Sequence, residues 1–258
     1  MIITLSPSKG QDFDAPCSTK KHSTPIALKD SQLLIKELRK LKTGDIKKLM
    51  GVSENIAKLN IDRYKNFKTP FTLSNARQAI FAFKGDVYSG IEIDKFTAAD
   101  LVYAQDHLRI LSGLYGCLRP LDLIQPYRLE MKTKLANSRG DNLYQFWGED
   151  ITENINRVLS KQDEPVLINL ASAEYFKSIK PKLLKGRLLN INFKEIKDGK
   201  SRVVAIFAKR ARGMMTDYIL RNRIEKPAAI KKFKTGGYKF SKNDSDDSQW
   251  TFVRPQPA

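Results

Sequence analysis

The chain is poor in the residues that build metal centres and disulfide frameworks. Among its 258 residues it has two cysteines, Cys17 and Cys117, and two histidines, His22 and His107. No HExxH, no Glu-x-x-His and no cysteine pair at metal-binding spacing occurs, which disfavours a zinc or ferritin-like site. The two cysteines could pair, but they are more typical of reduced cytosolic thiols. We therefore expect a cytoplasmic protein with no metal and no cofactor.

Long apolar stretches and familiar catalytic patterns are also missing. No run of about 18 apolar residues exists, which argues against a membrane span or a membrane partner. The N-terminus has no positive region ahead of an apolar stretch, so it does not resemble a signal peptide. GxxxxGK[ST], GxGxxG and GxSxG are absent. With 41% hydrophobic residues the chain can nevertheless bury a sizeable core.

What the chain has in excess is positive charge, and that charge is concentrated. The net charge is +18, and Phe176–Lys242 alone holds 20 Lys and Arg against four acids. Residues 1–175 carry 25 basic and 21 acidic residues, and the last 16 residues contribute −2. Charge gathered in one part of a folded chain predicts a polyanionic partner. Nucleic acid is the first candidate, because neutralising phosphates releases counterions and supplies affinity without sequence readout.

Hydrophobic periodicity predicts one α/β domain with α+β-like features, residues 1–258, in which helices surround a mixed central sheet. No Gly/Ser-rich linker or internal repeat divides it, and residues 243–258 are expected to form a variable C-terminal tail, with a loop or short hairpin at 241–250. Strands are predicted at 2–5, 166–171, 188–193 and 202–208. Helices are predicted from Asp30, which we expect to cap the first of them, and at 46–50, 56–64, 74–83, 97–111, 142–160 and 210–223.

Residues 46–60, IKKLMGVSENIAKLN, resemble the helix-hairpin-helix element of DNA-repair and replication proteins. A tight hairpin needs a glycine where φ is positive or space is short, and Gly51 stands there. Free amides at the start of the second helix could hold a phosphate without reading bases. The second glycine of the pattern is Ser53, which suits a helix cap but makes the anion geometry less secure. The hairpin residues expected to contact DNA are Lys47, Lys48, Gly51, Val52, Ser53 and Lys58.

An ordinary αα-hairpin of two packed helices is the alternative reading of this stretch. Further along the chain, the basic side chains expected to contact DNA are Lys177, Lys209, Arg210 and Arg212.

Several polar blocks do not follow the periodicity of a core, and they predict a cationic cleft. NLASAEYFKSIK (169–180) follows a predicted buried strand, and strand ends are where α/β folds build their sites. The other blocks are the start of the chain, 82–90, 108–131 and 207–215. The cleft candidates are Ser6, Lys9, Arg109, Arg119, Asp122, Arg128, Glu130, Ser172 and Tyr175. Structural ion pairs that hold long loops are an equally good explanation of the charged members.

The same blocks permit a catalytic alternative. Lys84, Asp86, Glu174 and Lys209 are the candidates for general acid–base or nucleophilic groups in an enzyme acting on a damaged nucleotide or nucleic acid. A third possibility is iron sequestration by carboxylates, but the ligand spacing for it is missing. Binding without a reaction is the favoured interpretation, because no catalytic motif is present.

The blocks together resemble a known family. L-S-P-S-K (5–9), AFKGDVYSG (82–90), HLRILSGLYGCLRPLDLIQPYRLEM (107–131), LYQFWG (143–148), NLASAEYFKSIK (169–180) and FAKRARG (207–213) are similar, in order, to the YaaA family of bacterial peroxide stress resistance proteins. The likeness runs from Met1 to about Tyr238. The long 107–131 block is its most specific part.

The resemblance implies a cytoplasmic bacterial protein that protects DNA from oxidative damage by hydrogen peroxide. It also implies a link to low unincorporated iron, a single-domain α/β fold, a helix-hairpin-helix element and binding to duplex DNA along a positive cleft. The hairpin at Gly51 falls where the DNA-binding element of the family would lie. No reaction is implied by the resemblance, so the catalytic reading stays an alternative.

Overall fold

A long mixed sheet runs through the computed structural model, which describes residues 1–14 and 17–257. The strand order is β11-β12-β9-β8-β1-β5-β6, with β10 paired to β9. The five central strands, β12, β9, β8, β1 and β5, are all parallel. The other three strands, β6, β10 and β11, each pair antiparallel with a neighbour. The strands of this sheet are β1 (Ile2–Leu5), β5 (Leu108–Ser112), β6 (Gly116–Leu118), β8 (Val166–Asn169), β9 (Arg187–Lys197), β10 (Lys200–Arg202), β11 (Lys239–Ser241) and β12 (Gln249–Pro255).

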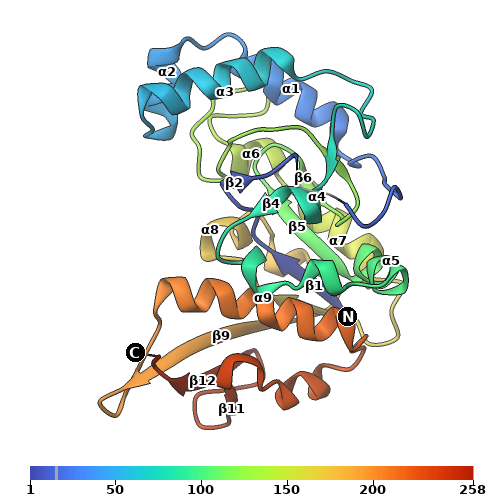
Figure 1. The fold of residues 1–258 in the computed structure, drawn as a ribbon, viewed down its shortest axis with the longest axis vertical. Helices are drawn as coiled ribbons and strands as arrows, with labels where there is room; N and C mark the ends of the chain where they lie inside the picture. The colour runs from blue at the N-terminus through green and yellow to red at the C-terminus, as the bar shows by residue number, and fades with distance from the viewer. Residues whose placement is uncertain (15–16, 258) are drawn as a thin grey trace.

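Helices cover the sheet and form a separate layer above it (Figure 1). β1 and β5 are buried at every position, as expected for strands that are packed on both faces. α5 and α9 pack on each other, and α7 packs on β1 and β6. The α-helices are α1 (Leu28–Leu38), α2 (Thr43–Met50), α3 (Glu54–Asn66), α4 (Ala79–Ala82), α5 (Ala98–His107), α6 (Leu143–Trp147), α7 (Asp150–Leu159), α8 (Ala173–Phe176) and α9 (Ala205–Arg221).

Short elements complete the chain. Two small antiparallel pairs, β2 with β4 and β3 with β7, hold the loops around the sheet. Across the described residues, no helix is long and apolar enough to cross a membrane. The bounds of the remaining elements are β2 (Gly10–Gln11), β3 (Arg77–Gln78), β4 (Phe83–Lys84), β7 (Leu123–Ile124) and the 3-10 turns η1 (Tyr88–Gly90), η2 (Ile93–Lys95), η3 (Pro181–Leu183), η4 (Pro227–Lys232) and η5 (Thr235–Gly237).

The α/β class and the mixed sheet are confirmed, but several predicted elements are wrong. The run at 202–208 is not a strand, because β10 ends at Arg202 and α9 begins at Ala205. Ala208, Ala211, Met215 and Ile219 are buried at helical spacing, which is the periodicity that governs this stretch. The apolar side chains before them, Val203 and Ile206, are 60% and 56% exposed.

Other corrections concern the ends of helices. The predicted helix at 97–111 stops at His107 and continues as β5. The predicted helix at 142–160 is divided at Gly148, whose φ is +47°. At 74–83 only Ala79–Ala82 is helical. The first helix begins before Asp30, which lies in its first turn and pairs with Arg139 instead of capping.

The C-terminal segment belongs to the sheet. β11 and β12 form an antiparallel pair across the predicted loop or hairpin at 241–250. β12 then runs parallel to β9 from Gln249 to Pro255. The predicted variable tail, 243–258, therefore contains a strand of the central sheet, and its final residue lies outside the described part of the chain.

Candidate functional site

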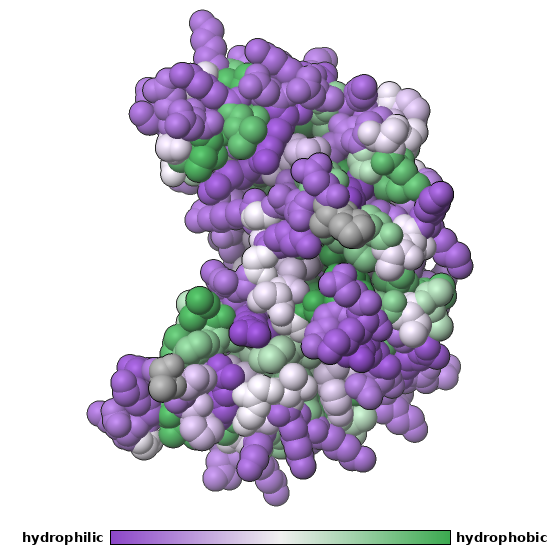
Figure 2. Space-filling model, in the orientation of Figure 1, coloured by the Kyte–Doolittle hydropathy of each residue, from purple (hydrophilic) through white to green (hydrophobic). Residues whose placement is uncertain are grey.

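A cleft of about 590 Å³ lies on the hollowed side of the molecule, below the layer of α1, α2 and α3 (Figures 1 and 2). Its walls come from the loop after β1, the loop before η1, the segment 127–132, the start of α8 and the first turns of α9. The cleft thus brings together blocks that are far apart in sequence. The predicted residues lining it are Ser6, Lys9, Asp86, Arg128, Glu130, Ser172, Glu174, Tyr175, Lys209 and Arg212.

The loop after β1 is held by two serines. Ser172 donates its backbone N–H to Ser6 Oγ at 2.9 Å, and the two hydroxyl oxygens lie 3.3 Å apart. Ser8 Oγ donates to the backbone oxygen of Lys84, and a Cβ on Gly85 would lie 2.8 Å from Ser8 Oγ. Gly85 has φ +121°, a backbone conformation that residues with a side chain rarely adopt. Close packing of these loops fixes where the polar ends of β1 and β8 meet.

η1 and the loop before it are pressed directly against α9. A Cβ on Gly90, at the end of η1, would lie 2.3 Å from the oxygen of Arg210, so the two backbones touch only because Gly90 has no side chain. Tyr88 donates to the backbone oxygen of Ser6 at 3.0 Å, which joins η1 to the end of β1. The contact brings Asp86 to within 3.5 Å of Lys209. An acid and a base from distant segments therefore form one wall of the cleft.

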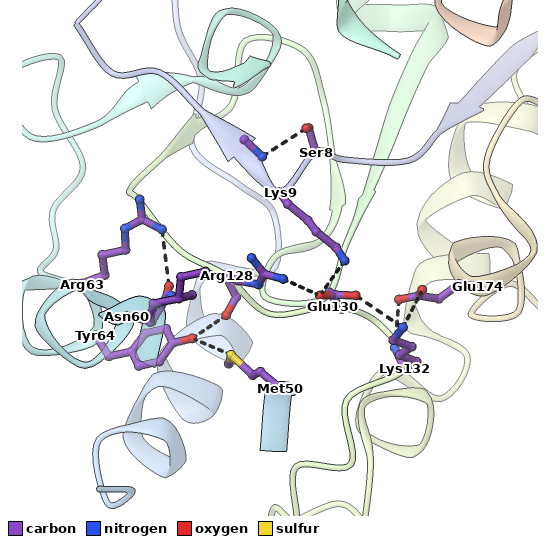
Figure 3. Close-up of polar contacts among 12 residues, drawn as sticks. Ser8, Lys9, Met50, Asn60, Arg63, Tyr64, Arg128, Glu130, Lys132 and Glu174 are labelled. Atoms are coloured by element: carbon purple, nitrogen blue, oxygen red, sulfur yellow. Dashed lines mark hydrogen bonds and ion pairs between the residues drawn. The ribbon is translucent and has the colours of Figure 1, made fainter. Parts of the chain in front are cut away.

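Glu130 stands between three cations in the middle of the cleft (Figure 3). Its carboxylate lies 3.1 Å from Lys9 Nζ, 3.3 Å from Arg128 Nη2 and 3.6 Å from Lys132 Nζ. Lys132 Nζ also lies 4.0 Å from Glu174, which accepts the Lys132 backbone N–H at 3.3 Å. Lys9 and Lys132 are exposed while Glu130 is buried. The cluster presents positive charge to solvent over a buried carboxylate.

The pKa of Glu130 reflects this arrangement. Burial would raise it, but the hydrogen bond and charge of Lys9, together with the charges of Lys132 and Arg128, hold the pKa of the carboxyl below its ordinary value. Glu130 is therefore ionised at neutral pH. Its charge orders three cations that would otherwise repel one another.

The αα-hairpin formed by α2 and α3 is attached to the cleft through Tyr64 (Figure 3). Tyr64 donates its hydroxyl hydrogen to the backbone oxygen of Arg128, and the same oxygen atom of Tyr64 lies 3.9 Å from Met50 Sδ. Burial raises the pKa of Tyr64 well above the ordinary value, so the phenol remains a donor. A groove of about 350 Å³ between Lys48 and Lys134 shares Glu130 and Lys132 with the cleft. The hairpin and the cleft therefore border neighbouring hollows that share two lining residues.

Gly51 and Ser53 make the turn between α2 and α3. Gly51 ends α2 in the left-handed region with φ +61°, and no atom lies within 4 Å of its Cβ position. Its conformation, and not crowding, is what requires glycine. Ser53 caps α3 by accepting the N–H of Ile56 at 3.4 Å. Glu54 in the first turn pairs with Lys58 at 2.7 Å and places negative charge beside the remaining amides.

Three predicted cleft residues lie elsewhere. Arg119 pairs with Asp122 at 2.8 Å, and that carboxylate also accepts Ser23 Oγ at 2.6 Å. Arg109 is buried on β5, where its guanidinium donates to the backbone oxygens of Gln105 and Leu108. These side chains hold loops, as the structural alternative proposed. Arg128 and Glu130 also form an ion pair, but theirs lies in the cleft. For these two residues a structural role and a role in binding are therefore compatible.

The other basic candidates surround the site without lining it. Lys84 is exposed and lies 3.9 Å from Asp12. Lys177 is exposed and lies over the ring of Tyr144. Arg210 is exposed on α9 and lines a different hollow. Lys47 and Lys58 are exposed on the αα-hairpin.

Sequence reasoning missed Lys132. It has no place in the predicted set, yet it joins Glu130 and Glu174 and lines both hollows. The signal was present in the order Arg128, Glu130, Lys132, because alternate residues of an extended segment face the same side. Tyr127 and Gln11 also line the cleft and were not predicted.

The site offers acid–base and anion-binding chemistry. Three carboxylates and five cations line one cleft. Among residues 1–14 and 17–257, no group of three or more His, Cys, Asp or Glu could hold a metal ion. Cys117 is buried, and that burial raises the pKa of its thiol to about 12. The carboxylates of the cleft all have basic partners, so phosphate is a better ligand for this surface than a free cation.

Comparison with known proteins gives matches over the full chain. The model of a family described as peroxide stress protein YaaA matches residues 1–244. A protein of Shewanella loihica named UPF0246 protein is 49% identical over 258 residues, which is all of both chains. A UPF0246 protein of Colwellia psychrerythraea is 49% identical over 256 residues, covering 99% of this chain and all of the relative. A UPF0246 protein of Ralstonia nicotianae is 49% identical over 254 residues, or 98% and 99% of the two chains.

Proposed function

Because the chain belongs to the peroxide stress protein YaaA family, we propose that it binds DNA in the cytoplasm and protects it during peroxide stress. Binding takes place through phosphates, in the cleft and along the groove beside the helix-hairpin-helix element formed by α2 and α3. The observation that carries the proposal is the shared border of the two hollows at Glu130 and Lys132. Because the hollows are neighbours, a DNA backbone lying across both would meet basic side chains from α9 to α2.

Charge and geometry support this reading in different ways. The strongly basic segment Phe176–Lys242 supplies β9, α9 and β11, so long-range attraction comes mainly from the half of the molecule below the cleft (Figure 1). The near-neutral first 175 residues supply Lys9, Arg128 and Lys132 at defined positions. Contacts of this kind neutralise phosphates and do not read bases.

We place the implied link to low unincorporated iron downstream of DNA binding. Glu130, Glu174 and Asp86 each lie within 4.0 Å of a lysine or arginine. A hard cation would have to displace these partners and approach a surface of positive potential. The cleft is therefore better suited to exclude iron from bound DNA than to store it.

A second function, an enzyme acting on damaged nucleic acid or nucleotide, is favoured by one observation. Carboxylates repel phosphates, yet Asp86 and Glu174 line the cleft with Lys209. Lys209 Nζ lies 3.5 Å from Asp86, close enough to exchange a proton through a bound group. Lys84, the fourth catalytic candidate, stays outside the cleft.

The test is a salt series on duplex DNA with two matched double variants. Lys48→Gln/Lys132→Gln removes charge from the groove, whereas Lys226→Gln/Lys242→Gln removes the same charge from a separate hollow beside Trp250. We expect the first pair to weaken binding about tenfold and to lower the salt slope by about two, and the second to change little. Equal losses in both would overturn the proposed path. Product analysis with Glu174→Gln tests the enzymatic candidate: a product formed by wild type and lost in the variant establishes it.

A further inference from the structure

One cation of the cleft has no counter-ion. Lys9, Arg128 and Lys132 share Glu130, and Lys209 pairs with Asp86. The guanidinium of Arg212 forms no hydrogen bond or ion pair with any residue that the structure describes, although it lines the same cleft. It is half-buried, and burial lowers its pKa. A desolvated cation of this kind is costly unless an anion completes it.

The helix that carries Arg212 keeps it in place. Its neighbour Gly213 is in backbone contact with the loop before η1, because a Cβ there would lie 1.8 Å from the oxygen of Val87. Arg212 therefore stands on a rigid element beside a rigid loop. From this fixed backbone position the guanidinium can reach a phosphate in the cleft and present its donors in the paired geometry that arginine prefers.

The rest of the cleft suits the organic part of such a ligand. Pro7, Val87, Tyr127, Leu129 and Tyr175 form an apolar and aromatic lining, against which a flat ring can pack. The volume of about 590 Å³ lies within the range of about 300–1,000 Å³ that small-molecule sites have.

Hydroxyl groups give this lining polar contacts for an attached sugar or base. Ser6 and Ser172 line the cleft, and their hydroxyl oxygens lie 3.3 Å apart. Ser6 Oγ donates to Ser172 Oγ, so the Ser172 hydroxyl can donate to a ligand and both oxygens can accept from it. The cleft therefore has a cation for phosphate, an apolar wall for a ring and hydroxyls for polar contacts.

We infer that the cleft binds a single nucleotide unit, with its phosphate on Arg212 and its base against the apolar lining. The inference rests on the proposed function in taking nucleic acid as the partner. A base stacked inside a duplex cannot enter such a hollow, so the nucleotide is either free or unpaired in DNA. The two sources share the phosphate and the base, and experiment separates them.

Calorimetric titration of the folded protein with inorganic phosphate, a deoxynucleoside and the matching deoxynucleoside 5′-monophosphate tests the inference. We expect the monophosphate to bind more tightly than either fragment. Arg212→Gln should weaken its binding about 10- to 100-fold, because it removes a charge-assisted contact to phosphate. Arg210→Gln is the matched control, since it makes the same change two residues earlier on α9 but outside the cleft. It should leave the affinity within about twofold.

The source of the nucleotide is read from duplexes with and without one unpaired nucleotide. Tighter binding of the duplex with the unpaired nucleotide, lost in Arg212→Gln and kept in Arg210→Gln, identifies DNA as the source, whereas binding of the free monophosphate alone identifies the mononucleotide. Arg212→Lys keeps a charge if Arg212→Gln fails to fold, and it should give an intermediate loss. If wild type binds the monophosphate no better than its fragments, and the duplex with an unpaired nucleotide no better than matched duplex, the inference is overturned while the duplex affinity still supports the proposed function. Monophosphate binding without duplex binding overturns the proposed function alone.

Discussion

Gly213 of α9 and Val87 of the loop before η1 are in backbone contact. A Cβ built on Gly213 would lie 1.8 Å from the Val87 carbonyl oxygen, far inside any contact that real side chains make. The oxygen belongs to backbone and cannot turn away as a flexible side chain would. The position of Asp86 beside Lys209, and of the loop beside Arg212, therefore depends on the absence of one methyl group.

Gly213→Ala should destabilise the protein by about 2–4 kcal/mol, because α9 and the loop must separate to admit the methyl group. The measurement is urea unfolding. Gly44→Ala is the control, since Gly44 lies in the first turn of α2 with no atom within 4 Å of its Cβ position. Alanine is the better helix former, so this variant should gain up to about 1 kcal/mol. Equal stability of Gly213→Ala and wild type would contradict the close contact.

Tyr64→Phe should cost about 1 kcal/mol of stability and should also weaken DNA binding, because it releases Arg128 from the αα-hairpin. Tyr103→Phe removes a comparable hydrogen bond, 3.0 Å to the backbone oxygen of Ile224, outside the cleft. It should show the loss of stability without the loss of affinity. Filter binding and thermal unfolding of both variants decide the matter. Parallel changes in affinity would show that Tyr64 has no special role.

Glu130→Gln tests whether the central carboxylate of the cleft limits DNA binding. Removing the central carboxylate frees Lys9, Arg128 and Lys132 for phosphates, so a DNA-binding surface should bind several-fold more tightly, with a steeper salt dependence. Asp94→Asn, at an exposed position away from the cleft, makes the same charge change as a control. Weaker binding in Glu130→Gln than in Asp94→Asn would mean that the carboxylate contacts the ligand itself.

His107 should make stability depend on pH. Burial lowers the pKa of its imidazole below 6.5, against the opposing hydrogen bond to the Met1 carbonyl oxygen. Between the folded pKa and 6.5 the unfolded chain binds more protons, so the free energy of unfolding falls as the pH falls through this window. The slope contributed by one group is at most about 1.4 kcal/mol per pH unit. His107→Gln should flatten this slope, which urea unfolding at several pH values would show.

Arg254 and Glu195 form a buried pair behind α9. Glu195 is 1% exposed, lies 2.8 Å from Arg254 Nε and accepts the hydroxyl of Tyr238. Arg254→Met leaves a buried carboxylate unpaired and should cost about 3–5 kcal/mol. The double variant Arg254→Met/Glu195→Met should cost less than Arg254→Met alone, which chemical unfolding would show. Additive losses would mean that the two side chains act independently.

Local patterns predicted the parts of the fold that local physics decides. The apolar run at 2–5 could only be a buried strand, and Gly51 followed by Ser53 matched a left-handed helix end and a helix cap. The strand predicted at 202–208 was wrong because the prediction rested on apolar content and not on the spacing of the apolar residues. Its buried positions continue at helical spacing into α9, while Val203 and Ile206 face solvent.

The site was predictable where strands end and obscure where loops cross. Ser6 and Ser172 follow β1 and β8, which are adjacent parallel strands, so their meeting follows from topology. The grouping of Lys9 with Glu130 depends on a long irregular segment, and nothing local fixes its path. For the same reason Arg109 could not be distinguished from Arg128: both are arginines in one block, and only tertiary packing buries the first among backbone oxygens.

The place of β1 in the sheet has a consequence for how the protein is made. β1 leaves the ribosome before both strands that flank it in the sheet, because its partners begin at Leu108 and Val166. At roughly 5–20 residues per second the nascent chain carries an unpaired apolar strand for many seconds. Its burial waits for contacts of high sequence separation, which form slowly. A chaperone that shields Ile2–Leu5 during synthesis would therefore protect an apolar strand until β5 and β8 are available to pair with it.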